Sequence, residues 1–381
     1  MPRYDIAVIG AGIAGASVAA NLLQAGAGSV VLLEMEAQPG YHTTGRSAAI
    51  FAATYGPAPI RALTRASAAF YTAPPDGFSD TPLISPRDIL MIARPDQATA
   101  LEALVAEVSD QAAVDVLDAA QTRAANPLIR AGYAAGAMLD RTGQDIDVAA
   151  LHQGYLRLFR ARGGTVLTRA GVTDVQRVGA GWRLALPRDT VEADRVVNAA
   201  GAWADEVGQM AGADPIGLRP KRRTALMIAA PDGVQTDPLP LTVDVEEAFY
   251  LKPDAGKLLI SPADETPSPP CDAQPEELDV AICVDRIETA FDLSVRRIES
   301  KWAGLRSFVA DKAPVVGPSA RDDGFFWLAG QGGYGIQTAP ALSRLAAALI
   351  LDQPVPADIA DQGLEPCDLA PDRPAVSAAE K

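Results

Sequence analysis

An α/β fold with a doubly wound parallel sheet is predicted by three features at the start of the chain. Residues 6–9 form an apolar run typical of a strand that is buried on both faces. Three glycines in the spacing G-x-G-x-x-G come next, at positions Gly10, Gly12 and Gly15. An Ala- and Leu-rich helix is expected over 13–25, and a second apolar strand over 30–33 ends at Glu34. This order predicts a βαβ unit that binds a dinucleotide.

The glycines and the acid each have a physical role in such a unit. Gly10 permits the tight turn, Gly12 lets a phosphate approach the backbone, and Gly15 lets the helix pack on the strand. The helix N-terminus offers free N–H groups and a positive dipole end to a pyrophosphate. Glu34 is placed to accept hydrogen bonds from ribose hydroxyls, which favours FAD or NAD over NADP. The alternatives are a purely structural βαβ unit and a solvated carboxylate at the strand end.

Composition limits the class of protein. The chain has 381 residues, enough for two domains, and a net charge of −15, which argues against nucleic acid and anionic membranes as partners. The three cysteines Cys271, Cys283 and Cys367 lack C-x-x-C spacing, and there are only two histidines. We therefore expect neither a disulfide framework nor a metal site.

The location of the protein is expected to be cytoplasmic. Met1 comes almost directly before the first strand, which leaves no room for a signal peptide. The apolar runs are far shorter than the ~18 residues of a membrane span, so no integral membrane segment is expected.

The polar loop over 40–56 follows the predicted ribose acid and is expected to return toward the cofactor. Arg46 and Ser47 are placed to reach a phosphate, and Ala48 and Ala49 are small enough for a flat ring to lie close. The alternative is a plain surface loop.

The remaining elements follow from hydrophobic periodicity and from Gly and Pro breaks. Helices are expected over 57–71, 97–108, 148–158 and 276–291, and from the glycine-rich loop 330–338 to 351. Strands are expected over 83–93, 165–167, 172–178, 182–186, 195–198, 217–230, 249–256, 257–260 and 325–329. In the strand 217–230, alternation places Lys221 and Arg223 on one face and Arg222 on the other. The Pro- and Asp-rich tail from Asp352 is expected to be loose.

The glycine fingerprint together with GYHTTGRSAA resembles the D-amino-acid oxidase family of FAD-dependent oxidoreductases. Within that family the sequence is most similar to the bacterial D-arginine dehydrogenases, which carry a nearly identical GYH-[ST]-TGRSAA loop. The resemblance continues through DIDVAALHQGYLR, VNAAGAW, PKRR, FYLKPDAG, WAGLRSFVAD and QGGYGIQT. It implies noncovalent FAD and oxidation of an amine beside a carboxylate, with covalent attachment of the flavin at His42 as a minor alternative.

The resemblance also implies a domain division of the glutathione-reductase-like, D-amino-acid oxidase type. A Rossmann-type FAD-binding domain is expected over 1–54, 141–216 and 304–381. An interleaved α+β substrate-binding domain, built on an antiparallel or mixed sheet, is expected over 55–140 and 217–303.

The residues expected to bind FAD come from the glycine fingerprint, the polar loop, the backbone near the adenine, the small-residue turn after 198 and the second glycine loop. They are Gly10, Gly12, Ile13, Ala14, Gly15, Glu34, Gly45, Arg46, Ser47, Ala48, Ala49, Val172, Ala200, Gly201, Trp203, Gly332, Gly333, Tyr334, Gly335, Ile336, Gln337 and Thr338. The helix that follows the second glycine loop is expected to stabilise negative charge on the reduced flavin. A glycine-rich connector is the alternative for that loop.

The resemblance assigns the substrate carboxylate to Arg223 and Arg306, whose planar forks can bond both oxygens. Tyr55 and Tyr250 are expected to close the pocket and exclude water. The alternatives are structural arginines and core tyrosines. No histidine or carboxylate stands out as a general base.

The side-chain pocket is expected to involve Ile50, Ala52, Ile89 and Gly333. D-arginine dehydrogenases have a glutamate near the position of Ile89, and histidine and threonine at the positions of Ile50 and Ala52. Because a buried guanidinium without its carboxylate is costly, we expect neutral, apolar D-amino acids to be preferred.

The predicted function is FAD-dependent oxidative deamination of a D-amino acid to a 2-oxo acid and ammonia. One alternative is oxidation of glycine, sarcosine or another N-substituted amino acid. Another is a noncatalytic FAD-binding subunit of a larger complex. The sequence leaves the electron acceptor open between a quinone and oxygen.

Overall fold

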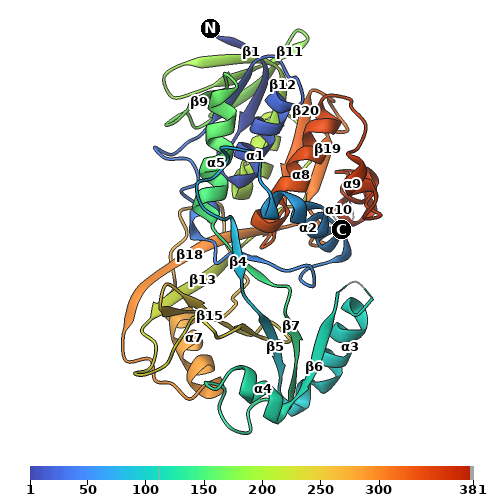
Figure 1. Ribbon diagram of the computed structural model, residues 1–381. Coiled ribbons are helices and arrows are strands. Elements are labelled where there is room, and N and C mark those ends of the chain that lie inside the picture. The colour runs from blue at the N-terminus through green and yellow to red at the C-terminus, as the bar shows by residue number, and fades with distance from the viewer. Residues whose placement is uncertain (111, 378–381) are drawn as a thin grey trace.

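The computed structural model describes residues 1–110 and 112–377, which are arranged around two sheets (Figure 1). The first sheet has a parallel centre in the order β9 (Thr165–Leu167), β2 (Val30–Leu33), β1 (Arg3–Ile9), β12 (Thr190–Asn198) and β20 (Phe325–Ala329). The antiparallel strands β11 (Gly181–Ala185), β10 (Asp174–Val178) and β19 (Val315–Pro318) extend it. The predicted α/β fold with a parallel sheet is confirmed.

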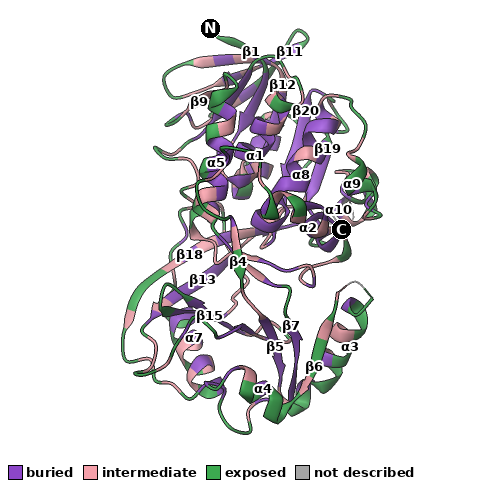
Figure 2. Cartoon of the chain, viewed as in Figure 1, coloured by how far each residue is buried: buried purple, intermediate pink, exposed green. Residues whose placement is uncertain are grey.

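The first sheet is covered on both faces, which explains its continuous apolar strands. In β1, Ile6 and Val8 join the core on one face, whereas Ala7 and Ile9 join the core on the other. The helices that cover it are α1 (Ile13–Gln24), α5 (Val148–Ala161), α8 (Gly335–Ile350), α2 (Ala58–Thr72) and α6 (Ala204–Met210). Figure 2 shows the strands as buried and the outer loops as exposed.

The second sheet is mixed and lies below the first in Figure 1. Its order is β17 (Thr266–Pro267), β13 (Arg219–Ile228), β16 (Lys257–Ser261), β15 (Tyr250–Asp254), β14 (Leu241–Asp244), β5 (Ile89–Ala93), β7 (Gly136–Asp140) and β6 (Val114–Asp118). Strand β18 (Ile298–Phe308) pairs with β13, and the β14–β5 pair is parallel. The helices beside this sheet are α3 (Ala98–Val108), α4 (Ala119–Ala125) and α7 (Glu277–Ala290).

A third, small sheet links the two parts through β3 (Ile50–Phe51), β8 (Gln144–Ile146) and β4 (Ile84–Pro86). The single strand predicted over 83–93 is therefore wrong, because the chain leaves β4 and enters β5 in a different sheet. Arg87, between them, fixes the turn by donating to Asp145 Oδ2 at 2.8 Å and to the carbonyl of Leu239 at 2.7 Å.

The tail was expected to be loose, and this is wrong for its described part, 352–377. It contains α9 (Ala357–Ala360) and α10 (Pro374–Ser377), separated by a short 3₁₀ turn, η4 (Pro366–Asp368). Apolar side chains between the prolines are buried, and they are Ile359, Leu364, Leu369 and Val376. Arg373 donates to both carboxylate oxygens of Asp311 at 2.8 and 2.9 Å, which ties the tail to the body.

The division into two discontinuous domains stays a prediction. Helix α2 lies in the range assigned to the second domain, yet its residues Leu63 and Ala66 belong to the core over the first sheet. The long strands β13 and β18 run between the two parts (Figure 1). Their register pairs Lys221 with Arg306 and Arg223 with Gly304, so both predicted carboxylate-binding arginines lie close together.

Candidate functional site

A cavity with three adjoining lobes runs from the first sheet to the second. The glycine lobe is bounded by Gly10, Glu34, Val172 and Trp203. The bridging lobe is bounded by Ile13, Ser47, Ser307 and Gly332 and shares Gly12 and Gly201 with the glycine lobe. The sheet lobe is bounded by Tyr55, Ile89, Glu247 and Tyr334 and shares Arg223 and Arg306 with the bridging lobe.

Close backbone packing at the glycine lobe depends on two of the fingerprint glycines. Gly10 has a φ of +96°, and a Cβ there would lie 2.5 Å from the carbonyl oxygen of Ala199. A Cβ on Gly15 would lie 1.8 Å from the carbonyl oxygen of Gly10. No other residue type fits either position, so both glycines are required for the backbone to pack this closely at the edge of the lobe.

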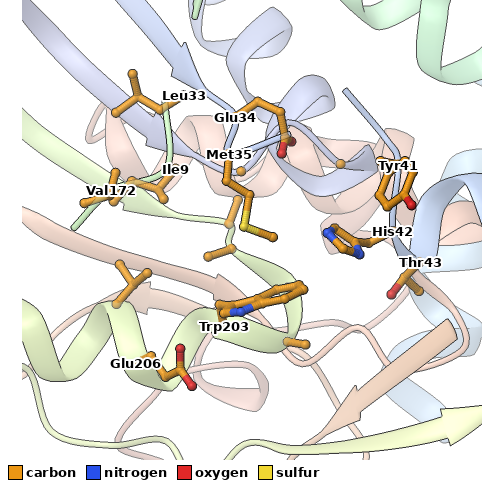
Figure 3. Close-up of a pocket in the computed structure, with 18 of the residues that line it drawn as sticks. Ile9, Leu33, Glu34, Met35, Tyr41, His42, Thr43, Val172, Trp203 and Glu206 are labelled. Carbon is orange, nitrogen blue, oxygen red and sulfur yellow. The ribbon is translucent and has the colours of Figure 1, made fainter. Parts of the chain in front are cut away.

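The wall of the glycine lobe carries a buried acid and several large side chains (Figure 3). Glu34 is 6% exposed and accepts hydrogen bonds from the N–H groups of Ala11 and Glu36, both at 2.9 Å. Each carboxylate oxygen thus retains a lone pair for a further donor. Figure 3 shows Met35 and Trp203 pointing into the same space, with His42 beside Trp203 at a ring distance of 4.8 Å.

Thr44 holds the N-terminus of α1 and was missed by the sequence analysis. Its Oγ1 accepts a hydrogen bond from the N–H of Ile13 at 2.9 Å, which satisfies one of the free donors of the helix. The signal was a hydroxyl residue inside the polar loop, but the contact spans 31 positions and no local pattern reveals it. His152 is buried on α5, where its Nε2 bonds the carbonyl of Ala11 at 2.9 Å and burial lowers the pKa of its ring.

Arg46 lines the bridging lobe, but its guanidinium is directed at the second part of the protein. Its Nη1 donates to the carbonyls of Ala273 and Ala303, both at 2.9 Å, and its Nη2 bonds Asp272. Its own carbonyl accepts from Trp302 Nε1 at 3.0 Å. The fold therefore uses Arg46 to hold the polar loop against β18, and a contact with phosphate stays a prediction.

Most of the other residues predicted to bind a cofactor line the cavity, although their roles stay predictions. On the glycine and bridging lobes these are Gly10, Gly12, Ile13, Ala14, Glu34, Ser47, Ala48, Val172, Ala200, Gly201, Trp203, Gly332, Gly333, Gly335 and Ile336. On the sheet lobe they are Ala49, Tyr334 and Gln337. Three of the residues predicted to bind the cofactor line none of the three lobes, namely Gly15, Gly45 and Thr338.

The floor of the sheet lobe is one face of the second sheet. Its register places Tyr250, Val243, Met91 and Met138 opposite one another across β15, β14, β5 and β7. In the next row along the strands, Leu241 pairs with Ile89. The floor is apolar apart from the hydroxyl of Tyr250 and the ammonium of Lys252, which lies two residues further along β15, and Ile50 and Ala52 also line the lobe.

The two arginines stand where the apolar floor meets the second glycine loop. Arg223 Nε donates to the carbonyl of Asp264 at 2.9 Å, and its Nη2 lies 3.4 Å from Glu265. Among the described residues, no carboxylate lies within 4.0 Å of the guanidinium of Arg306. A Cβ on Gly333 would lie 2.8 Å from Arg306 Nη1, so only glycine lets this guanidinium lie over the loop.

The pKa values of the two arginines shift in opposite directions. Burial and the neighbouring Arg306 lower the pKa of Arg223. Burial also opposes charge on Arg306, but Tyr55, Tyr250 and Glu247 outweigh it and raise the pKa of Arg306. Both groups remain cationic at neutral pH. The pair therefore forms a positive site at the junction of the lobes, suited to an anionic ligand.

Tyr55 and Glu247 also line the sheet lobe and lie close to each other. The Tyr55 hydroxyl lies 3.4 Å from Glu247 Oε2, and its ring lies edge-on to Tyr334 at a centroid distance of 5.1 Å. Burial and then the charge of Glu247 raise the pKa of Tyr55. Glu247 was also missed by the sequence analysis, because nothing in the segment 244–250 distinguishes it from a solvated turn residue.

The described part of the chain meets neither the requirements of a metal site nor those of a membrane-spanning helix. Within it, no group of three His, Cys, Asp or Glu side chains is arranged to hold a metal ion. None of its helices has the length and hydropathy required to cross a bilayer.

The parallel sheet carries the glycine lobe, and the mixed sheet carries a cavity lined by two arginines. This combination is typical of flavin-dependent oxidoreductases that bind the substrate on a separate sheet. The model of the DAO family, described as FAD dependent oxidoreductase, matches residues 5–349. The chain belongs to this family.

Individual relatives are distant. Glycine oxidase of Bacillus licheniformis is 26% identical over 361 residues, which cover 93% of this chain and 94% of the relative. The match spans only 36% of FAD-dependent oxidoreductase domain-containing protein 1 of Xenopus laevis, at 29% identity and over 44% of this chain. It spans 58% of hydrogen cyanide synthase subunit HcnC of Pseudomonas aeruginosa, at 26% identity and over 64% of this chain.

Solved structures share the fold. Glycine oxidase from Geobacillus kaustophilus superposes with a TM-score of 0.80 at 22% identity, covering 93% of this chain and 96% of that one. The L-alpha-glycerophosphate oxidase from Mycoplasma pneumoniae, a structure with FAD bound, gives 0.81 at 17% identity, covering 92% and 95%.

FAD, the cofactor of the family, fits the glycine and bridging lobes. Gly10 lets the turn after β1 pack against the backbone of Ala199 at the wall of the glycine lobe, and Glu34 in the same wall has lone pairs free. The N-terminus of α1 borders both lobes through Gly12. Within the described chain, the buried hydroxyl of Ser307 on the bridging lobe has no hydrogen-bond partner, which is the state of a group that awaits a ligand.

Proposed function

We propose that this protein oxidatively deaminates D-amino acids with neutral, apolar side chains to 2-oxo acids and ammonia. One observation carries the proposal: two arginines meet at the end of the flavin lobes, directly beside an apolar floor. An amino acid offers the matching pair of features, a carboxylate and an apolar side chain. The D configuration is supported by the sequence resemblance to D-arginine dehydrogenases.

The arginines bind and orient the substrate in this proposal. Arg306 is free of carboxylate partners among the described residues, so its fork can bond a substrate carboxylate without breaking an existing ion pair. Arg223, held by the carbonyl of Asp264, adds a second cation at a fixed position. FAD, when bound, supplies the chemistry by accepting hydride from the substrate Cα.

Tyr55 and Tyr250 complete the enclosure. Tyr250 lies on the floor strand β15, and Tyr55 lines the same lobe with its ring edge-on to Tyr334. Two aromatic walls reduce the access of water to the reacting centre.

The floor supports an apolar side chain over a cationic one. Ile89 is 4% exposed and pairs with Leu241, so the centre of the floor offers no acid to a guanidinium. Lys252, in the same part of the cavity, has its Nζ 2.9 Å from Asp145, an acid that already accepts from Arg87. A guanidinium buried against the floor itself would meet no acid there that lacks a basic partner, which is costly.

A second candidate is oxidation of glycine or an N-substituted amino acid, favoured by the match to glycine oxidase over 93% of the chain. The floor formed by Val243, Met91 and Met138 is wider than glycine requires. The 2-oxo acid separates the two, because both glycine and a D-amino acid release ammonia, but a D-amino acid with a side chain gives a branched or longer 2-oxo acid. Glycine gives glyoxylate.

The test is an anaerobic screen of flavin bleaching with the purified holoprotein and D- and L-amino acids, glycine and sarcosine. We expect D-leucine, D-methionine and D-phenylalanine to bleach the flavin faster than D-arginine and D-lysine. The variant Ile89→Glu should raise the ratio of D-arginine to D-leucine rates about tenfold or more, since it adds an acid to the floor. A clear preference of the unmodified protein for D-arginine refutes the apolar assignment, and bleaching by none of the compounds refutes the enzyme.

A further inference from the structure

The sheet lobe contains one carboxylate that no basic side chain neutralises. Of the acids near the arginines, Glu265 lies 2.7 Å from Lys221 and 3.8 Å from Lys312. Glu107, at the outer edge of the lobe, is 2.8 Å from Arg61. For Glu247 the described residues provide no Lys or Arg nitrogen within 4.0 Å.

The backbone holds Glu247 in a costly conformation. It lies in the turn between β14 and β15 with a φ of +57°, in the left-handed region that non-glycine residues rarely adopt. Its N–H donates to the carbonyl of Asp244 at 2.8 Å, which fixes the turn. Glycine or asparagine would adopt this conformation at a lower cost than glutamate.

The side chain of Glu247 is coupled to the same groups that define the carboxylate site. Its Oε2 lies 3.4 Å from the Tyr55 hydroxyl. Its charge raises the pKa of Arg306 and opposes the lowering of the pKa of Arg223. Arg223, Arg306 and Glu247 therefore line one common space, and the other charged groups that line it, Arg61, Glu107, Lys252 and Lys312, each have an ion-pair partner.

We infer that Glu247 binds the amino group of the substrate, an inference that rests on the proposed function. A zwitterionic amino acid has one carboxylate and one ammonium, which complement the Arg223–Arg306 pair and Glu247. Glu247 is then the residue that selects amino acids over acids that lack the amine. An acid that lacks the amine would bind only through its carboxylate, to Arg223 and Arg306.

The experiment measures binding without turnover, by anaerobic calorimetry on the chemically reduced holoenzyme. The ligands are D-leucine and 4-methylpentanoate, which has the same carboxylate and side chain but no amine. The variant Glu247→Gln keeps the size of the side chain and its backbone strain. The matched control is Glu246→Gln, because Glu246 is exposed in the same turn and bonds Gln97 Nε2 at 2.9 Å.

Glu247→Gln should weaken D-leucine about 10- to 100-fold, as expected for one charge-assisted hydrogen bond, and change 4-methylpentanoate by less than about twofold. Glu246→Gln should change neither. Equal weakening of both ligands, or of neither, overturns the inference and leaves the proposed function standing. A loss for D-lysine larger than that for D-leucine also overturns it, since Glu247 would then hold a distal cation.

Two further outcomes are decisive. Wild-type enzyme that binds neither ligand refutes the proposed function and, with it, this inference. If Glu247→Gln fails to fold, Glu247→Asn, which suits the left-handed backbone, takes its place and must show the same selective loss for D-leucine.

Discussion

Replacing Gly333 with alanine should disable the enzyme without unfolding it. Gly333 lies in the second glycine loop, and its φ is outside the left-handed region, so alanine can adopt the same backbone. The added Cβ would meet Arg306, at 2.8 Å from Nη1 and 2.9 Å from Cζ. These atoms form the end of a flexible side chain, which can move away at little cost in stability.

The displacement can be worked out from the contact distances. Ordinary contact with a Cβ begins at 3.4 Å, so the guanidinium must retreat by about 0.6 Å from its present 2.8 Å. Misplacement of a substrate-orienting group by ~1 Å can cost about 10²-fold in rate. We therefore expect kcat/KM for D-leucine to fall about 10- to 100-fold, while the thermal midpoint of the holoprotein changes by less than about 2 °C.

A double-mutant cycle with Arg306→Lys identifies the cause. Lysine lacks the guanidinium atoms that the new Cβ meets, so Gly333→Ala should have almost no further effect on kcat/KM in the Arg306→Lys background. Additive losses would show that the methyl group acts on something other than Arg306. Full activity of the single Gly333→Ala variant would refute the assignment of Arg306 to the substrate carboxylate.

Three further perturbations test the supporting structure. Arg222→Met leaves the buried Asp279 without the guanidinium that bonds it at 2.8 and 3.1 Å, and should lower the free energy of unfolding by about 3–5 kcal/mol in urea titrations. Thr44→Val removes the acceptor of the Ile13 N–H and should lower the free energy of unfolding by about 0.5–2 kcal/mol. It should also weaken FAD, as measured by titration of the apoprotein. Burial lowers the pKa of His152, so the unfolded chain binds its proton first as the pH falls below about 6.5. The free energy of unfolding should therefore decrease from pH 7 to pH 5, with a shallower slope in His152→Gln.

Each of these has an outcome that contradicts it. Arg222 lies on the face of β13 opposite Arg223, so a large change in KM for Arg222→Met would contradict the predicted alternation. Unchanged FAD affinity in Thr44→Val would separate the cap of α1 from cofactor binding. An identical pH slope in His152→Gln would show that other groups cause the acid sensitivity.

The nucleotide end of the molecule could be predicted because its geometry is local in sequence. The turn, the helix start and the strand end that surround Gly10 all fall within about thirty residues of each other, and each follows a known period or spacing. The parallel sheet and the opening of the lobe follow directly. Thr44 escaped prediction because its contact with the helix start depends on how a loop folds back.

The substrate end could be predicted only in its arginines, and there by resemblance. Arg223 and Arg306 lie 83 positions apart in sequence and meet because β13 pairs antiparallel with β18. Nothing in composition or period fixes that register. The break between β4 and β5 was missed for the same reason, since an apolar run does not tell which sheet it joins. Glu247 was missed because only the residues around it in the folded protein distinguish it from a solvated turn residue.

The two ends of the cavity depend on different kinds of contact, so a substitution can change one end without changing the other. The glycine lobe is fixed by backbone contacts, in which a single methyl group at Gly10 or Gly15 would collide with a carbonyl. The surface of the floor is formed by side chains at alternate positions of β15, β14 and β5. The strands themselves pair through backbone hydrogen bonds, which do not depend on the identity of these side chains. Under the proposed function, a substitution at Ile89 should therefore change the chemistry offered to the substrate side chain and leave the glycine lobe intact. We expect substrate preference to change through the floor, because neither the glycine lobe nor the two arginines have to move with it.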